Sequence, residues 1–274
     1  MKILIATDME GITGVTNWDQ VTPGHAEYAR FRKLMTDDVN AAARGAFDAG
    51  ADEVLVADGH WAGSNILLEE LDSRVRLNSG SPSPLSMIQG LDQSVDGVLF
   101  VGYHARQGSQ KAVLDHTWSS LCVANLWLND VIAGEYTLNA AIAGHYHVPV
   151  LMISGDQTAS AQAVEQLGPL ETAVVKQATG RFAAECLPPG ITQELIRETA
   201  KRAVGRVMKK DSPKPFVLKS PVNVTVELFT SNMADQAMLM PGVARNGLRL
   251  SFVSADAVQA CSAFRSLVQM SYPR

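Results

Sequence analysis

Four side chains that can bind metal ions follow apolar runs of the sequence, each at the same kind of position. Asp8 and Glu10 come directly after one apolar run, His60 follows a second and His104 a third. Carboxylates and imidazoles together are ligand types that suit zinc. Asp8 and Glu10 are two residues apart, so in an extended chain both point to the same side. The pattern predicts a metal site built from these residues.

Each of these residues, taken alone, also has an ordinary structural explanation. An Asp at the end of a strand often caps a helix or forms a turn. A single Glu is often a solvated carboxylate, and a His after a strand is often a hydrogen-bonded loop residue. The metal interpretation rests on the coincidence that three apolar runs end in the same way. No compact ligand motif such as HExxH or a pair of CxxC sequences supports it.

The three apolar runs are typical of buried strands in a parallel sheet. They cover residues 2–7, 53–58 and 97–105. Apolar residues at spacings of three and four predict a helix over 27–49, and Gly50 ends it. A strand, a helix and a further strand form a βαβ unit, whose strands are parallel. Ligands of open parallel sheets bind beyond the carboxyl ends of the strands, where the metal-binding residues are expected to meet.

The rest of the chain continues this alternation and then departs from it. We expect strands at 74–80, 149–156 and 172–177, a hairpin at 121–134, and helices at 135–146, 157–167 and 190–209. After a proline-containing break at 211–216, we expect strands at 222–229 and 248–254 and helical segments at 231–239 and 255–269. The predicted fold is therefore a three-layer α/β/α domain with a largely parallel central sheet over residues 1–210. A smaller C-terminal α+β lobe, residues 211–274, packs on it.

Three further residues are candidates with competing interpretations. Glu135 opens a predicted helix, where the helix dipole favours a carboxylate and where it could also face an ion. His116 has Asp115 as its neighbour and could serve as a general base or a proton shuttle. Asp156 is an eligible acid, but its place before a helix favours a capping role.

The other histidines favour structural roles. His145 and His147 have the HxH spacing of some metal ligands, but they precede a strand and so belong to the opposite edge of the sheet. His25 follows Pro23 and Gly24 in a predicted loop, which favours a surface position.

Composition excludes several classes of function. The net charge is -5, from 23 basic and 28 acidic residues, and no run of Lys or Arg exceeds two, so we expect no nucleic-acid partner. No apolar run approaches the ~20 residues that span a bilayer, and the N-terminus does not read as a signal peptide. Three widely spaced cysteines suggest reduced thiols in a cytoplasmic protein. GxSxG, Walker A and GxGxxG motifs are absent, which argues against serine hydrolases, nucleotide triphosphatases and dinucleotide enzymes.

Several segments together resemble a known family. The most specific are DMEGI (8–12), DGH (58–60), LFVGYHAR (99–106) and GEYTLN (134–139), with support from 149–156, 175–177 and 239–242. In their order and spacing, along essentially the whole chain, they are similar to the D-aminopeptidase (DppA) family, the M55 metallopeptidases.

The resemblance implies a binuclear zinc centre, with two Zn²⁺ ions per subunit. Asp8 matches the carboxylate that bridges the two ions. The remaining protein ligands match Glu10, His60, His104 and Glu135. His116 matches the family's catalytic histidine near the metals, acting as base, nucleophile or oxyanion stabiliser.

The resemblance also implies an activity and an assembly. The activity is the release of N-terminal D-amino acids, such as D-alanine, from short peptides by metal-activated water. The assembly is a ring-like homo-oligomer, such as a decamer, that encloses its active sites and so favours small substrates. Two alternatives stay open: a two-metal hydrolase of another amide or ester, and a non-catalytic peptide-binding protein.

The chain departs from the family pattern at two places. Asp115 precedes His116 where the family has a small residue, and a charged neighbour could shift the pKa of the histidine. Tyr136 and Thr137 follow Glu135 where a small or aliphatic residue and a glycine are expected. These departures affect the expected substrate more than the expected metal site.

Overall fold

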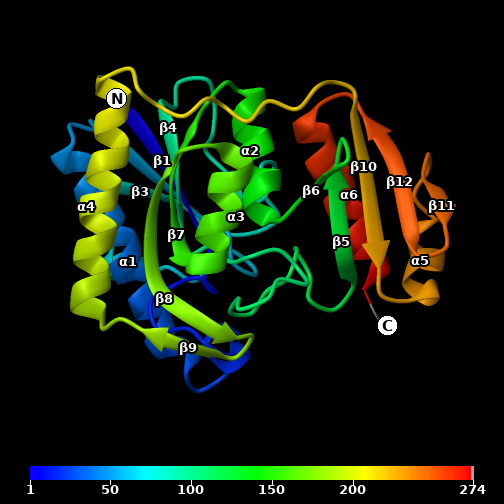
Figure 1. Ribbon diagram of the computed structural model, residues 1–274, viewed down its shortest axis with the longest axis horizontal. Helices are drawn as coiled ribbons and strands as arrows, with labels where there is room; N and C mark the ends of the chain where they lie inside the picture. Colours follow the sequence, from blue (N-terminus) through cyan, green and yellow to red (C-terminus); the bar gives the residue numbers. More distant parts are fainter. Residues whose placement is uncertain (273–274) are drawn as a thin grey trace.

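Two β-sheets with their covering helices make up the protein, which is described here from a computed structural model over residues 1–272 (Figure 1). The larger sheet has the strand order β3-β2-β1-β4-β7-β8-β9. Its strands are β1 (Lys2–Thr7), β2 (Glu53–Asp58), β3 (Val75–Asn78), β4 (Gly97–Val101), β7 (Val150–Asp156), β8 (Glu171–Gly180) and β9 (Ala183–Cys186). All neighbours pair in parallel except β8 and β9. The predicted, largely parallel sheet is confirmed.

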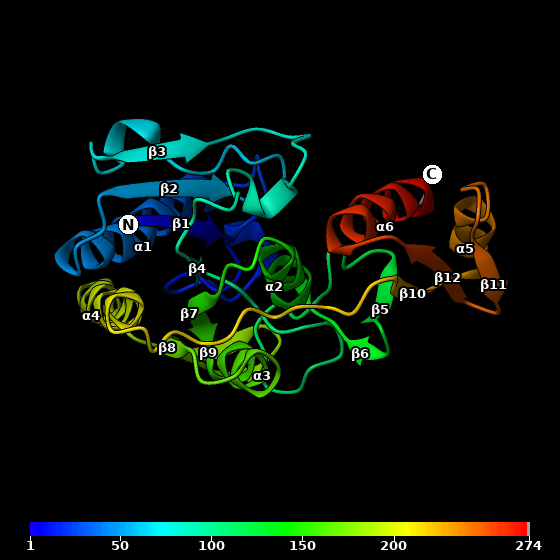
Figure 2. The same ribbon diagram turned by 90° about the horizontal axis from the view of Figure 1, so that it is seen from above.

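Helices cover both faces of this sheet, as the view from above shows (Figure 2). One face carries α1 (Tyr28–Asp48) and α4 (Pro189–Met208), and the other carries α2 (Glu135–His145) and α3 (Gln157–Leu167). Alternate residues of β1 point to opposite faces, so Ile3 and Ile5 join one hydrophobic core while Leu4 and Ala6 join the other. Burial on both faces explains why these strands are continuous apolar runs. The three-layer α/β/α prediction is confirmed.

Short 3₁₀ helices lie in the connections of this domain. They are η1 (Trp18–Gln20), η2 (Leu68–Glu70) and η3 (Ser86–Ile88).

The second sheet forms a lobe beside the first domain (Figure 1). Its strand order is β11-β12-β10-β5-β6, with α5 (Ser231–Ala237) and α6 (Ala257–Ser271) as its helices. The strands are β5 (Val123–Leu128), β6 (Val131–Ile132), β10 (Val222–Leu228), β11 (Ala244–Asn246) and β12 (Arg249–Ser254).

The lobe does not coincide with the predicted range 211–274. Strands β5 and β6 come from the hairpin that the prediction placed within residues 1–210, yet β5 pairs antiparallel with β10, Val224 opposite Leu128. This pairing joins segments about a hundred residues apart, and local patterns in a sequence carry no information about such partners. The predicted boundary at residue 210 therefore does not separate the two sheets.

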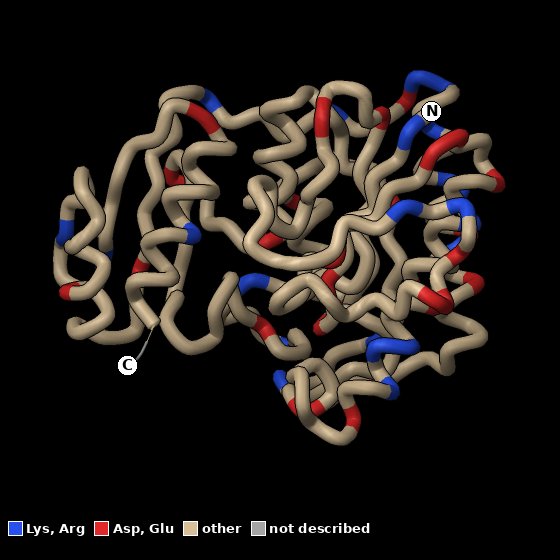
Figure 3. The backbone as a smooth tube through the Cα atoms, turned by 180° about the vertical axis from the view of Figure 1, so that it is seen from behind, with Lys and Arg blue, Asp and Glu red and all other residues tan. Residues whose placement is uncertain are grey.

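The distribution of charged residues agrees with the composition. Figure 3 shows Lys and Arg interspersed with Asp and Glu along the chain. None of the helices within residues 1–272 combines the length and the apolar character needed to cross a membrane.

Candidate metal centre

The carboxyl ends of three neighbouring strands deliver the predicted ligands to one buried place. β1 lies between β2 and β4 in the sheet, so the residues after these strands are adjacent. Glu135 arrives from the first turn of α2, and His116 from the loop that follows β4. The side chains that meet are Asp8, Glu10, His60, His104, His116 and Glu135, each no more than 8% exposed. The structure therefore brings together the four predicted ligands at the strand ends with Glu135 and His116.

His60 faces two carboxylates with one nitrogen only. Its Nδ1 lies 3.1 Å from Asp8 Oδ1 and 3.2 Å from Glu10 Oε2. Its Nε2 lies 2.7 Å from the carbonyl oxygen of Val21, which can only accept a hydrogen bond. The proton of the neutral ring therefore sits on Nε2, and Nδ1 presents a lone pair to the carboxylates.

His104 repeats this arrangement on the other side of Asp8. Its Nε2 lies 3.3 Å from Asp8 Oδ2 and 3.2 Å from Glu135 Oε1, while Nδ1 donates to the carbonyl of Ala105 at 3.0 Å. The two oxygens of Asp8 thus face two different histidines. Asp8 divides the cluster into a half with Glu10 and His60 and a half with His104 and Glu135.

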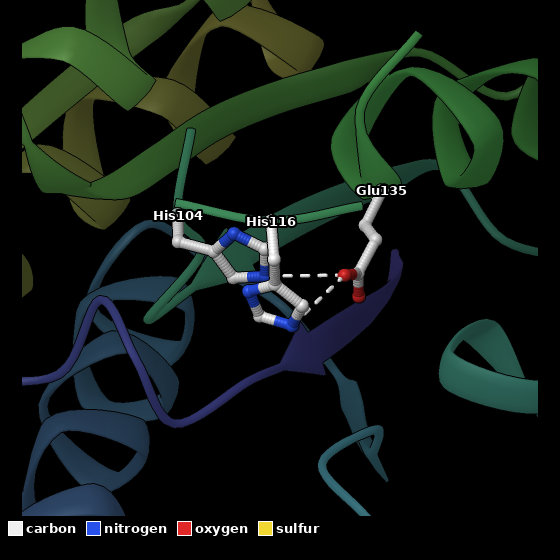
Figure 4. Close-up of side chains that lie close together, drawn as sticks. All are labelled: His104, His116 and Glu135. Atoms are coloured by element: carbon white, nitrogen blue, oxygen red, sulfur yellow. Dashed lines mark ion pairs between the residues drawn. The ribbon is translucent and has the colours of Figure 1, made fainter. Parts of the chain in front are cut away.

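His116 lies against the second half (Figure 4). Its ring stacks on that of His104, with centroids 4.0 Å apart and planes 9° apart. Its Nδ1 donates to the carbonyl of Leu114 at 2.8 Å, so Nε2 is free to face Glu135 Oε1 at 3.5 Å and Glu10 Oε1 at 3.9 Å. The edge of Trp18 packs against the ring, with centroids 5.4 Å apart. Contacts on several sides therefore fix the orientation of this imidazole.

The donor set fits cations. Neutral histidines that present lone pairs to carboxylate oxygens repel them unless a positive charge lies between. Asp8 Oδ2, Glu10 Oε2 and His104 Nε2 are buried and lack a hydrogen-bond partner. The possible ligand atoms of the cluster form two groups, and the atoms of each group all lie within 4.8 Å of one another. One group comes from Asp8, Glu10 and His104, and the other from His104, His116 and Glu135. Oxygen and imidazole ligands in this arrangement are suited to zinc.

The pKa shifts of the cluster also indicate that its carboxylates favour a positive charge nearby. Burial disfavours charged His60 and His104, but the surrounding carboxylates outweigh it and hold both pKa values well above the usual range. Burial also opposes ionisation of Asp8, yet the close imidazoles of His104 and His60 keep its pKa well below normal. Burial, followed by the charge of His104, lowers the pKa of His116. His116 is thus the histidine of the cluster that stays neutral most readily.

Two acids beside the site have structural partners. Asp115 Oδ2 accepts hydrogen bonds from the amides of Gly108 and Ser109 at 2.7 and 3.1 Å, and Oδ1 lies 3.0 Å from Arg181 Nε. The charged neighbour of His116 is therefore paired with an arginine of the β8–β9 turn. Asp156 accepts from two amides of the first turn of α3, which confirms its capping role.

The remaining histidines lie outside the site. His145 and His147 flank the end of α2 at the surface, and His25 is exposed beside Asp19. Sequence reasoning assigned no role to Lys176, which is buried close to Glu10. The available signal was a single lysine inside the apolar strand AVVKQ.

Comparisons with known proteins agree with the predicted resemblance. The family model for M55 peptidases, described as D-aminopeptidase, matches residues 1–266. A D-aminopeptidase of Bacillus subtilis (strain 168) is 36% identical over 273 residues, which covers 99% of this chain and 98% of that protein.

A solved structure is similar over the same extent. It is described as the Zn-dependent D-aminopeptidase DppA from Bacillus subtilis, a self-compartmentalizing protease. The two chains share 35% identity and a TM-score of 0.95, with 99% of this chain and 98% of that chain covered. Since the family model and both relatives span nearly the whole sequence, this chain belongs to the D-aminopeptidase family of M55 peptidases.

Proposed function

We propose that this protein is a zinc-dependent aminopeptidase that releases N-terminal D-amino acids, such as D-alanine, from short peptides. The observation that carries the proposal is the buried meeting of three carboxylates and three histidines at the strand ends. Its relatives supply the reaction class, because they are D-aminopeptidases and one is described as Zn-dependent. A cluster of ligands alone would indicate a metal and leave the reaction open.

The site would hold two zinc ions per chain. Asp8 would bridge them, because its two oxygens face opposite halves of the cluster. Glu10 and His60 would complete one half, and His104 and Glu135 the other.

The chain's own residues would orient the substrate and move protons. Zinc, when bound, supplies Lewis acidity and lowers the pKa of water toward neutrality. His116, neutral and held by Leu114 and Trp18, is placed to accept a proton at Nε2 and return it to the leaving amine. The backbone amide of Trp118 donates to Glu135 Oε1 at 2.7 Å and so holds that carboxylate in place.

The proposal is tested with matched peptides. The purified protein should hydrolyse D-Ala-D-Ala and D-Ala-Gly-Gly and should leave L-Ala-L-Ala and L-Ala-Gly-Gly largely intact. A chelator should abolish turnover, and added Zn²⁺ should restore it. Turnover that survives complete removal of metal would refute the zinc mechanism.

The same assay separates the alternatives. Metal-dependent cleavage of other amides or esters, with D-peptides untouched, would identify a two-metal hydrolase of different specificity. Tight peptide binding without turnover in the zinc-loaded protein would identify a peptide-binding protein. Metal analysis that returns two zinc equivalents per chain supports the binuclear centre, and one equivalent contradicts it.

A ring-like homo-oligomer, such as a decamer, is proposed from the relative described as a self-compartmentalizing protease. Mass measurement in solution tests it, and a monomer at working concentration would contradict it. A cytoplasmic location is proposed from the three free cysteines, since thiols stay reduced in that compartment.

A further inference from the structure

Lys176 of β8 is buried in the molecule with all of its donors used. Its side chain is 1% exposed. The ammonium Nζ donates to the carbonyl oxygens of Glu10 at 2.6 Å, Ile12 at 2.9 Å and Val15 at 2.8 Å. An ammonium group has three donors, and these three bonds match them one for one.

The three carbonyls belong to a single segment, residues 10–15, which carries one of the proposed ligands. The carbonyl oxygen of Glu10 faces Lys176, while its carboxylate faces His60 at 3.2 Å and His116 at 3.9 Å. The bond at the carbonyl therefore fixes the backbone from which the carboxylate extends. A shift of this peptide would move the carboxylate out of the cluster.

Other contacts hold the same segment, and one of them acts on the other end of the Glu10–Gly11 peptide unit. The amide of Gly11 donates to the carbonyl of Gly102 at 2.8 Å, and a Cβ on Gly11 would lie only 2.0 Å from the carbonyl oxygen of Tyr103. Thr13 donates from its amide and its hydroxyl to Asp38. Lys176 reaches the segment from β8, which is separated from β1 in the sheet by β4 and β7.

The charge of Lys176 is costly at this position. Burial lowers its pKa to about 8, and the carboxylate of Asp156 is the strongest influence in the opposite direction. A methionine would fill a similar volume without the cost of burying an ammonium group. The ammonium group contributes what methionine lacks, namely three hydrogen bonds to the segment that carries Glu10.

We propose that Lys176 is a positioning residue of the metal centre, holding the Glu10 backbone so that the Glu10 carboxylate is preorganised for the ion it shares with His60 and Asp8. This inference rests on the proposed metal centre. Residues that hold metal ligands in place typically contribute 10–100-fold in metal affinity. Lys176 would act on the half of the site that contains Glu10 and leave the half with Glu135 unchanged.

The test is an equilibrium zinc titration of the metal-free, full-length protein against a chromophoric chelator. Lys176→Met should weaken the binding of one of the two ions by about 10–100-fold and leave the other as in the wild type. Lys201→Met, a change at an exposed lysine of α4, is the matched control and should bind both ions normally. Glu10→Gln should weaken the same ion as Lys176→Met.

The double variant identifies the route of the effect. If Lys176 acts through Glu10, Lys176→Met combined with Glu10→Gln should lose no more affinity than Glu10→Gln alone. Additive losses would overturn the inference. So would wild-type affinity in Lys176→Met, even with a lower unfolding temperature, because that is the signature of a merely structural lysine.

A second variant covers the case in which Lys176→Met does not fold. Lys176→Gln keeps an amide donor, so it should weaken the same ion by a smaller factor, and wild-type affinity in this variant would also overturn the inference. If Glu10→Gln itself binds both ions normally, the proposed metal centre fails instead. The two failures are therefore distinguishable.

Discussion

At the scale of single residues, His104 has the most central place in the cluster. It belongs to both groups of possible ligands, contacts Asp8 and Glu135, and stacks on His116. Its Nδ1 is held by the carbonyl of its own neighbour, Ala105, so its ring orientation depends little on distant parts of the chain. Such local support is typical of metal-binding histidines.

We predict that His104→Ala removes zinc from the half of the site that contains Glu135. The reason is that its Nε2 faces Asp8 and Glu135, whereas Glu10 and His60 form the other half. Metal analysis after dialysis should return about one zinc per chain, with no D-peptide turnover. His145→Ala, at an exposed histidine, should retain both ions. Full metal content in the His104 variant would contradict its assignment as a ligand.

His116 is predicted to serve the reaction more than the binding of metal. Its Nε2 lies farther from the carboxylates than the facing nitrogens of His60 and His104 do, and its pKa is lowered by burial and by His104. His116→Ala should keep two zinc ions and lose turnover by about 10²–10⁴-fold, the usual contribution of a general base. Loss of one zinc in this variant would make His116 a ligand, and full activity would remove it from the mechanism.

At the scale of elements, the sheet and α1 together hold the segment after β1. Thr13 is bonded to Asp38 of α1, which lies 1% exposed. Burial raises the pKa of Asp38 to about 7, although the hydrogen bonds from Thr13 favour its charged form. A helix that packs on the sheet thereby also fixes the chain that carries Glu10.

This arrangement predicts a pH dependence of stability. Asp38 keeps its proton up to about pH 7 when folded but loses it near pH 4 when unfolded, so its contribution to stability falls as pH rises from about 4 to 7. A shift of this size corresponds to about 4 kcal/mol across the range. Asp38→Asn, which resembles the protonated acid, should lack this loss.

Urea unfolding of the wild type and of Asp38→Asn at pH 5 and pH 8 measures this contribution of Asp38 to stability. The Asn variant should gain stability relative to the wild type between the two values, and comparison at each pH cancels the contributions of other groups. A difference that stays constant with pH would show that Asp38 is already ionised in the folded protein at pH 5.

At the scale of the whole molecule, metal and fold are expected to depend on each other. The core gathers three carboxylates in one buried place, where like charges repel unless a cation or bound protons neutralise them. Zinc at 1,000 times its Kd would stabilise the folded state by about 4 kcal/mol per site. Removal of zinc should therefore lower the unfolding temperature.

The pKa shifts of the histidines predict how the stabilisation by zinc depends on pH. Because the pKa values of His60 and His104 are raised, these histidines hold protons at neutral pH in metal-free protein, and zinc must displace them. Zinc binding should release protons, and the stabilisation by zinc should shrink as pH falls from 8 to 6. Calorimetry in buffers of different ionisation enthalpy measures the release. Binding without proton release would contradict this reading.

The sequence alone predicted the type of sheet and the meeting of most of the candidate ligands. Runs such as KILIAT, EVLVAD and GVLFV are strands because burial on both faces leaves no polar alternation, and their polar endings mark one edge of a parallel sheet. Local pattern suffices for these features. For Glu135 and His116, the residues alone left several interpretations open, and the family resemblance supplied the functional one.

Tertiary structure decided the features that depend on partners distant in the sequence. The hairpin β5–β6 joined the second sheet by pairing with β10, and Asp115 was paired with Arg181 of the β8–β9 turn. Lys176 contacts the segment that carries Glu10 only because β8 lies three strands from β1 in the sheet. Hydrogen bonds and strand pairs of this kind depend on positions in space, which a local sequence pattern does not encode. The meeting of Asp8, Glu10, His60 and His104 in one place was therefore predictable, whereas the contacts that hold them were not.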